Sequence, residues 1–172
     1  MPEIRPQIQL VLAPSTAPLL GVTSIFLAGT TTSTVDRDWR EVLIESLADL
    51  PITIVNPYRP DWDSSWQEDI TCQPFREQIK WELDMQLIWV RIIVFYFHPS
   101  TEAPISLLEF GLAARTKKSI VVCPEGYKKR GNVQIVCERY GLKLVESLEA
   151  VRQAIIDSSD RLREVLDSER GT

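Results

Sequence analysis

The fold is decided by the stretch from Arg91 to Arg115, RIIVFYFHPSTEAPISLLEFGLAAR. Its first part, Ile92 to Phe97, is a continuous run of β-branched and aromatic residues, which is typical of a parallel strand buried on both faces. Prolines and polar residues in segment 98–104 then end the strand and predict a loop. From Ile105 the apolar residues follow helical spacing. The stretch therefore predicts a strand, a loop and a helix, with the loop at the sheet edge where open α/β sheets bind ligands.

Glu109 lies in the first turns of this predicted helix and carries its candidate chemistry. An acidic residue there can simply complement the helix dipole, an effect of roughly 0.3–1 kcal/mol. Its neighbours Leu108 and Phe110 are apolar, however, and Gly111 removes a side chain two residues on. An ionised carboxylate that must meet a sugar carbon suits this setting. Glu109 is therefore predicted to be a nucleophile.

The rest of the chain alternates strands and helices. Further strands are expected at about 24–28, 52–55, 119–123 and 142–145, and helices at about 36–49, 73–88, 133–139 and from 147 onward. Such alternation predicts an α/β fold, a doubly wound parallel sheet of about five strands with right-handed crossovers. Residues 24–172 are expected to form one domain, preceded by an extended segment, 1–23, with a short edge strand at residues 8–12.

Composition limits the partners. A formal net charge of −5 argues against nucleic-acid polymers, and no apolar run is long enough to suggest a membrane span. The three cysteines have no CxxC spacing, and His98 is the only histidine. We therefore expect no metal and no cofactor. Reduced thiols and the lack of a recognisable secretory signal predict a cytoplasmic protein.

Two loops are candidates for ligand binding. Gly29, Thr30 and Thr31 begin a hydroxyl-rich turn that leads into a helix, where backbone amides meet anions, although a simple polar N-cap explains it as well. The segment 56–74 is long for a loop and contains Tyr58, Trp62 and Trp66 among charged residues. Aromatic residues in long loops line binding sites or pack on the domain.

Four short motifs resemble one family when they are taken together. They are IFLAG at 25–29, NP at 56–57 followed by DWD at 61–63, WELD at 81–84, and LEFG at 108–111. In this order they resemble the nucleoside 2-deoxyribosyltransferase-like proteins over about residues 24–145. The resemblance implies a flavodoxin-like sheet and a small-molecule nucleoside as substrate. It also implies that a glutamate nucleophile cleaves an N-glycosidic bond and that the sugar passes to another base.

The resemblance also assigns roles to individual residues. It implies that Trp62 stacks on the base, with Asp61 or Asp63 as a polar partner. It implies that Asp84 contacts the sugar, although helical phase leaves Glu82 as an alternative. The remaining substrate-binding candidates are Gly29, Thr30, Thr31, Asn56, Ser106 and Gly111.

His98 marks a departure from the family pattern. Some members have an aspartate here that serves the leaving base, whereas this chain has His98 after its central strand. The histidine either takes over the proton transfer or only caps the strand.

Two rival functions remain open from the sequence. One is hydrolysis of nucleoside 5′-monophosphates, which needs a phosphate site made by the threonine-rich turn with Ser100, Thr101 or Ser106. The other is non-catalytic nucleotide binding, which the histidine at position 98 favours. A homo-oligomer is expected, because segments 75–88 and 147–166 carry apolar helical faces and the family usually completes each site with a neighbouring chain.

Overall fold

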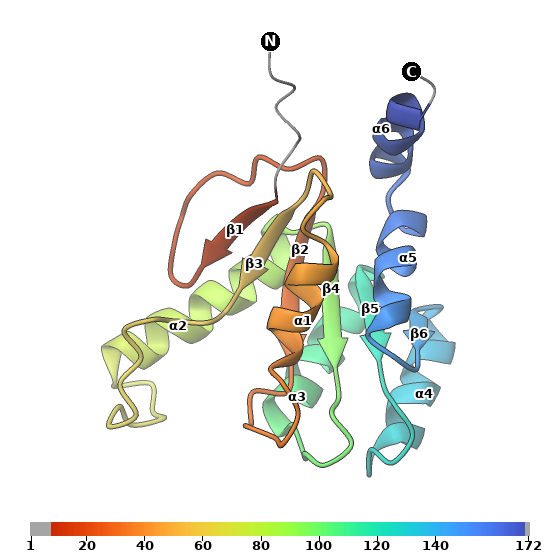
Figure 1. Ribbon diagram of the computed structural model, residues 1–172. Coiled ribbons are helices and arrows are strands. Elements are labelled where there is room, and N and C mark those ends of the chain that lie inside the picture. The colour runs from red at the N-terminus through yellow and green to blue at the C-terminus, as the bar shows by residue number, and fades with distance from the viewer. Residues whose placement is uncertain (1–7, 171–172) are drawn as a thin grey trace.

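A six-stranded parallel sheet forms the centre of the protein, in a computed structural model that describes residues 8–170 (Figure 1). The strand order is β1-β3-β2-β4-β5-β6. The strands are β1 (Gln9–Leu12), β2 (Ser24–Gly29), β3 (Thr53–Asn56), β4 (Ile92–Tyr96), β5 (Ser119–Val122) and β6 (Lys143–Val145). Without β1, the order is that of flavodoxin-like folds. The predicted single-domain α/β fold is thus confirmed, and its sheet has six strands because β1 pairs with β3 at the edge.

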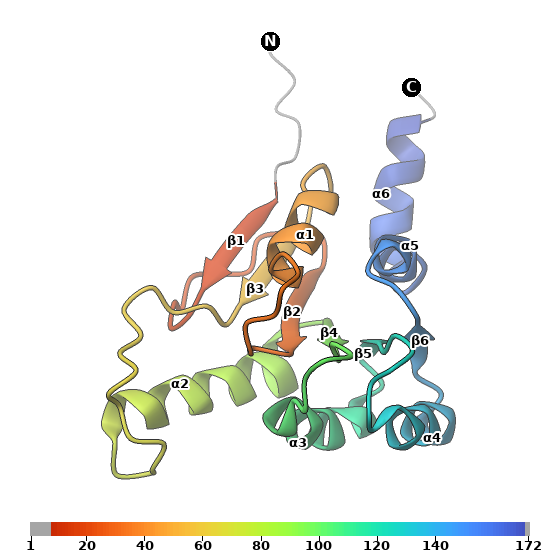
Figure 2. The same ribbon diagram turned by 60° about the horizontal axis from the view of Figure 1, so that its bottom comes forward.

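Helices cover both faces of the sheet (Figure 2). One face is covered by α1 (Trp39–Ser46) and α5 (Glu149–Asp157), and α6 (Asp160–Arg170) follows α5 and packs against it (Figure 1). The other is covered by α2 (Gln73–Asp84), η1 (Met85–Trp89), α3 (Pro104–Ala113), η2 (Ala114–Thr116) and α4 (Arg130–Tyr140). Each face has its own core cluster, and the tail helices α5 and α6 pack on the α1 side through Val151, Ile155 and Leu162.

The central strand β4 contributes side chains to both core clusters, because successive side chains of a strand point to opposite faces of the sheet. Ile92 and Val94 pack with the α1 helix, whereas Ile93 and Phe95 face α3. The ring of Phe95 lies 5.3 Å from that of Phe110, edge to face. This contact fixes α3, and with it Glu109, against the carboxyl end of the sheet.

The second helix does not continue regularly to residue 88. It becomes π-helical at η1, where the Val90 amide donates to the Met85 carbonyl over 3.0 Å, five residues back. The wider turn leaves Ile88 and Trp89 exposed. Alpha-helical periodicity alone gives no sign of this change, because π turns insert a residue into an otherwise continuous pattern.

Gly29 is required where β2 meets β4. Its φ is +124°, and a Cβ built there would lie 2.5 Å from the backbone N and O atoms of Tyr96. The adjacent Thr30 amide donates to the Tyr96 carbonyl over 2.8 Å. Glycine here lets two strands approach closely and starts the threonine-rich turn.

Candidate active site

Two carboxylates from neighbouring helices meet at one face of the sheet. Gln78, Glu82 and Gln86 are four residues apart along α2 and η1, which places them on one helix face. Glu109 comes from the second turn of α3. With the guanidinium of Arg40 from α1, these five residues form the Glu109 cluster.

Glu109 accepts a hydrogen bond from an amide and is affected by one negative and one positive side chain. Gln86, only 1% exposed, donates from Nε2 to Glu109 Oε1 over 3.0 Å. The pKa of Glu109 is raised from 4.5 to about 7, chiefly by burial and then by the negative charge of Glu82, against the lowering effects of the Gln86 hydrogen bond and of Arg40. A carboxyl group whose pKa lies near neutrality is characteristic of catalytic sites.

Glu82 is held in the same way, one turn earlier. Gln78 Nε2 donates to Glu82 Oε1 over 2.6 Å and to the Pro57 carbonyl over 3.0 Å. Because the Pro57 carbonyl only accepts, the orientation of the Gln78 amide is fixed. Burial also raises the pKa of Glu82, while the Gln78 hydrogen bond and Arg40 lower it.

Arg40 supplies the positive charge of the cluster. It is 8% exposed, and its guanidinium donates to the carbonyls of Leu27, Gly29 and Thr30 over 3.0–3.3 Å. Burial lowers its pKa to about 10, so it stays charged at neutral pH. The end of β2 therefore carries a fixed cation that acts on Glu82 and Glu109.

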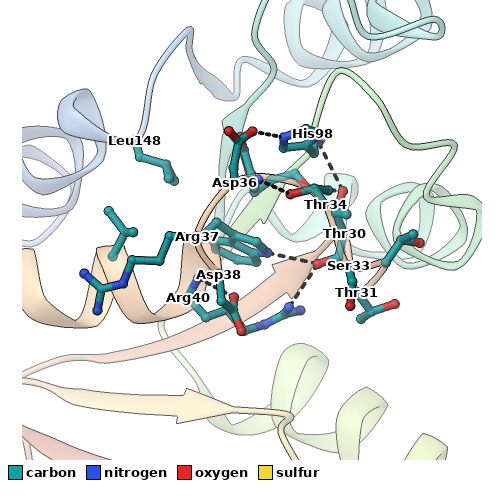
Figure 3. Close-up of a pocket in the computed structure, with 14 residues that line it drawn as sticks. Thr30, Thr31, Ser33, Thr34, Asp36, Arg37, Asp38, Arg40, His98 and Leu148 are labelled. Carbon is teal, nitrogen blue, oxygen red and sulfur yellow. Dashed lines mark hydrogen bonds and ion pairs between the residues drawn. The ribbon is translucent and has the colours of Figure 1, made fainter.

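A cavity of about 420 Å³ lies on the α1 side of the same sheet edge (Figure 3). We call it the threonine-loop cavity. Its lining includes Thr30, Thr31, Thr32, Ser33, Thr34, Asp36, Arg37, Asp38, Trp39, Arg40, Tyr96, His98 and Leu148. Trp39 and Tyr96 belong to the α1-side face. Glu109 and Glu82 do not line this cavity, and Arg40 is the residue common to both regions.

His98 closes one side of the threonine-loop cavity (Figure 3). Its Nδ1 accepts from the Ser100 amide over 3.1 Å, which places the ring proton on Nε2, and Nε2 then donates to Asp36 over 2.6 Å. The His98 amide also donates to the Thr30 hydroxyl. Nε2 and the backbone amide of His98 thus tie the threonine-rich turn to the end of β4, and Nδ1 bonds within the loop that follows β4.

The aromatic loop lies away from Glu109. Trp62 packs against Trp66 and Phe75, with ring centroids 5.0 and 6.4 Å apart, at the start of α2. Eleven residues separate Phe75 from Gln86, or about 16 Å at 1.5 Å per residue. Within one chain, the structure therefore does not bring Trp62 to Glu109, because Trp62 packs at the start of α2 and Glu109 bonds to Gln86 beyond its end.

The polar candidates of that loop make local contacts. Asp61 pairs with Arg59 over 2.9 Å, and the Ser65 amide donates to Asp63 over 2.8 Å. Asn56, at the end of β3, accepts from the Tyr58 amide. These contacts shape the loop at the sheet edge and account for its aspartates without a ligand.

The remaining candidate residues differ in their exposure and surroundings. Asp84 is exposed, whereas Glu82 is partly buried and its charge acts on Glu109. Ser106 is buried one turn before Glu109. A Cβ at Gly111 would meet no atom within 4 Å, so the described part of the chain gives no reason for a close approach there. Thr31 is exposed on the threonine-rich turn.

Three residues of the cluster were missed in the sequence. The signal for Gln78 and Gln86 was their spacing around Glu82, since polar residues repeated every four positions share a helix face. Arg40 gave no signal, because only the folded chain shows that it is buried. Across residues 8–170, no three side chains of His, Cys, Asp or Glu gather as a metal ion requires.

Comparison with known proteins agrees with this architecture. The model of the family described as "nucleoside 2-deoxyribosyltransferase like" matches residues 22–127, which include β2 to β5 and the Glu109 cluster. A search of curated proteins found no significant match. Within the described residues, no helix is both long and apolar enough to cross a membrane. Because the family match covers more than half of the chain, this protein belongs to the nucleoside 2-deoxyribosyltransferase-like family.

Proposed function

We propose that this protein cleaves the N-glycosidic bond of 2′-deoxyribonucleosides and transfers the sugar to another base. The observation that carries the proposal is the carboxylate pair, Glu109 and Glu82, held by glutamine amides beside a buried arginine. The family is generally enzymatic and points to a small nucleoside substrate. The carboxylate pair supports the more specific proposal of bond cleavage and sugar transfer.

Glu109 acts as the nucleophile in the proposed reaction. One carboxylate oxygen attacks the anomeric carbon, the bond to the base breaks with its electron pair on the base, and a glycosyl-enzyme ester forms. A second base, or water, then displaces Glu109 and restores the carboxylate. Two displacements retain the configuration at the anomeric carbon.

Glu82 is the better candidate for the second carboxylate. The transition state resembles an oxocarbenium ion, which a nearby negative charge stabilises. The charge of Glu82 acts on Glu109, whereas Asp84 is exposed on α2. The family motif favours Asp84, whereas the burial of Glu82 and its charge effect on Glu109 favour the alternative.

We assign His98 a role in shaping the turn. Its two ring nitrogens are engaged by Ser100 and Asp36, and it lines the cavity on the α1 side. A proton donor to the leaving base must reach that base within hydrogen-bond distance. The contacts of His98 therefore support strand capping over proton transfer.

Local charge favours a nucleoside over a nucleoside 5′-monophosphate. The threonine-rich turn was the candidate phosphate site, but its cavity also contains Asp36 and Asp38. Arg37 pairs with Glu45 and Glu41, and the guanidinium of Arg40 is bonded to carbonyls. Thr101 bonds to Thr30 and to the His98 carbonyl. A phosphate dianion would meet carboxylates there with little free positive charge.

We also propose a homo-oligomer, with a contact surface that keeps part of the predicted segment 75–88 and leaves out the tail. The tail helix α5 covers its own sheet face, and α6 packs on α5. Exposed apolar residues are found instead on α3, where Ile105, Leu108 and Leu112 share a helix face, and at the end of η1, where Ile88 and Trp89 are exposed. Mass measurement in solution tests this expectation, and a fully active monomer would contradict it.

A substrate panel tests the proposed function. The protein is incubated with deoxynucleosides, with and without a free acceptor base, and with deoxynucleoside monophosphates. Base exchange on deoxynucleosides is the expected result. Release of base only from monophosphates would support the hydrolase, and no reaction with any substrate would support a non-catalytic binding protein.

Trapping the intermediate identifies the nucleophile. A 2-fluoro-2-deoxy nucleoside slows breakdown of the glycosyl-enzyme, so mass spectrometry should map the adduct to the peptide that contains Glu109. Label on Glu82 or Asp84 instead would reverse the assigned roles.

A further inference from the structure

Gln86 is the member of the Glu109 cluster that donates a hydrogen bond to Glu109, and it is 1% exposed. It lies in the π-helical turn η1, and the chain passes from this turn through Val90 and Arg91 directly into the central strand β4. The Met85 carbonyl accepts from Val90, and the Arg91 amide donates to the Ser24 carbonyl of β2. Both ends of the turn are thus anchored, and π turns occur frequently at functional sites.

The contact between Gln86 and Glu109 is specific to one oxygen. Gln86 Nε2 lies 3.0 Å from Oε1, and within residues 8–170 this is the hydrogen bond that the Glu109 carboxylate makes. An amide donor favours the ionised form of a carboxylate and has no charge of its own to neutralise it. Oε2 is therefore the oxygen left for attack.

We propose that Gln86 is a positioning residue for the nucleophile: it holds Glu109 by Oε1, directs Oε2 to the anomeric carbon and keeps the carboxylate ionised. This inference rests on the proposed function for its chemical consequence, although the hydrogen bond itself does not. A nucleophile must be held close to its productive geometry by a rigid second residue. Gln86 meets this need because it is buried and its backbone is anchored.

Gln86 is one of several groups that set the ionisation of Glu109. The negative charge of Glu82 on α2 disfavours the ionised form of Glu109, and the positive charge of Arg40 on α1 favours it. Removing the Gln86 amide leaves burial and the Glu82 charge with less opposition, so the pKa of Glu109 should rise above its value of about 7. A rise of one unit means a tenfold smaller ionised fraction at acidic pH.

The test compares Gln86→Met with the matched control Gln73→Met. Gln73 lies on the same helix and donates to Glu77 over 2.9 Å, but that pair is on the surface. Methionine has nearly the volume of glutamine and no donor. Turnover is measured as a function of pH, and the Glu109 carboxyl is titrated by NMR after 13C labelling of glutamate.

We expect Gln86→Met to move the acid limb of turnover, and the NMR titration of Glu109, upward by about one pH unit. Turnover should then fall roughly tenfold more at pH 6 than at pH 9. The maximal rate should also fall while KM changes little, because the attacking oxygen is less well oriented. Gln73→Met should change neither curve.

A folded Gln86→Met protein with an unchanged titration of Glu109 would overturn the proposal. If the methionine variant does not fold, Gln86→Asn provides the same comparison, because the shorter amide cannot reach Oε1. The NMR titration needs no turnover. If the substrate panel is negative, the proposed function fails, while the titration still decides whether Gln86 controls Glu109.

Discussion

The two sides of the sheet's carboxyl edge treat acidic side chains in opposite ways. On the α3 side, Glu109 and Glu82 lie close together, and burial raises the pKa of both. On the α1 side, Asp36 is 66% exposed and bonded to His98, and Glu45 pairs with Arg37, which lowers the pKa of Glu45. The exposed carboxylates of Asp36 and Glu45 are paired and stabilise a turn and a helix. The buried carboxylates of Glu82 and Glu109 have raised pKa values, as catalytic carboxylates often do.

The distinction matters because the more evident hollow is on the other side. The threonine-loop cavity contains several residues predicted to bind substrate, among them Thr30, Thr31 and His98. Glu109 does not line it. The cavity alone would thus place the chemistry on the α1 side, whereas the proposed site on the α3 side rests on the electrostatic setting of the carboxylates.

Loss of the nucleophile should produce the largest effect. Glu109→Gln keeps the size of the side chain and removes its charge, so turnover should fall by about 10³ or more. The fold should remain, as circular dichroism and thermal unfolding can show. Near-normal turnover in the folded variant would end the assignment of the α3 side as the active site.

The difference in stability between Glu109→Gln and the natural protein should depend on pH. The folded pKa of Glu109, about 7, lies above its ordinary value of 4.5. Between these values the native state keeps a proton that the unfolded state has lost, so the free energy of unfolding falls as pH rises and the cost is complete above pH 7. Glu109→Gln removes a cost of at most about 3 kcal/mol, since solvent screens part of it.

Urea unfolding at two pH values measures this effect. Glu109→Gln should be more stable than the natural protein at pH 8.5, and the difference should be about fourfold smaller at pH 5. An equal difference at both values would mean that the ionisation of Glu109 does not affect folding. As a control, Glu45→Gln should show the opposite sign, because Arg37 stabilises that carboxylate.

Substitution of the second carboxylate should separate Glu82 from Asp84. Glu82→Gln should lower turnover by roughly 10² through loss of transition-state stabilisation. It should also shift the acid limb to lower pH, because one negative charge near Glu109 is gone. Asp84→Asn is the matched control on the exposed side and should stay within a few-fold of normal. The reverse ranking would restore Asp84 to the site.

The smallest effects are expected on the α1 side. His98→Asn breaks the hydrogen bond with Asp36, and a hydrogen bond of this kind contributes about 0.5–1.5 kcal/mol to stability. Turnover should therefore change by less than about tenfold. A loss comparable to that of Glu82→Gln would make His98 the proton donor and would bring the threonine-loop cavity into the reaction.

The stacking role of Trp62 stays a prediction, and the position of Trp62 in the fold gives it less support than the sequence resemblance does. Its side chain is 43% exposed and contacts Trp66 and Phe75. The sequence motif placed Trp62 with the base, but α2 holds it at the far end from Glu109. Motif resemblance carries a residue's identity to a new chain, whereas its distance from the nucleophile depends on how the loop folds.

The sequence by itself determined the architecture. The apolar run at 92–97 and the strand–helix alternation predicted a parallel sheet, because buried strands require continuous apolar residues and parallel strands require crossovers. The LEFG motif also predicted Glu109 as the candidate nucleophile. These features are local in the chain, so their spacing carries the information.

Only the tertiary structure decided which carboxylate faces Glu109. Glu82 and Asp84 are two residues apart, and a difference of about 200° around the helix, at roughly 100° per residue, sends one inward and the other to solvent. Arg40 and Gln86 reach the cluster from α1 and η1, far apart in sequence. Burial and proximity between distant segments set the pKa of Glu109, and neither is written in local spacing.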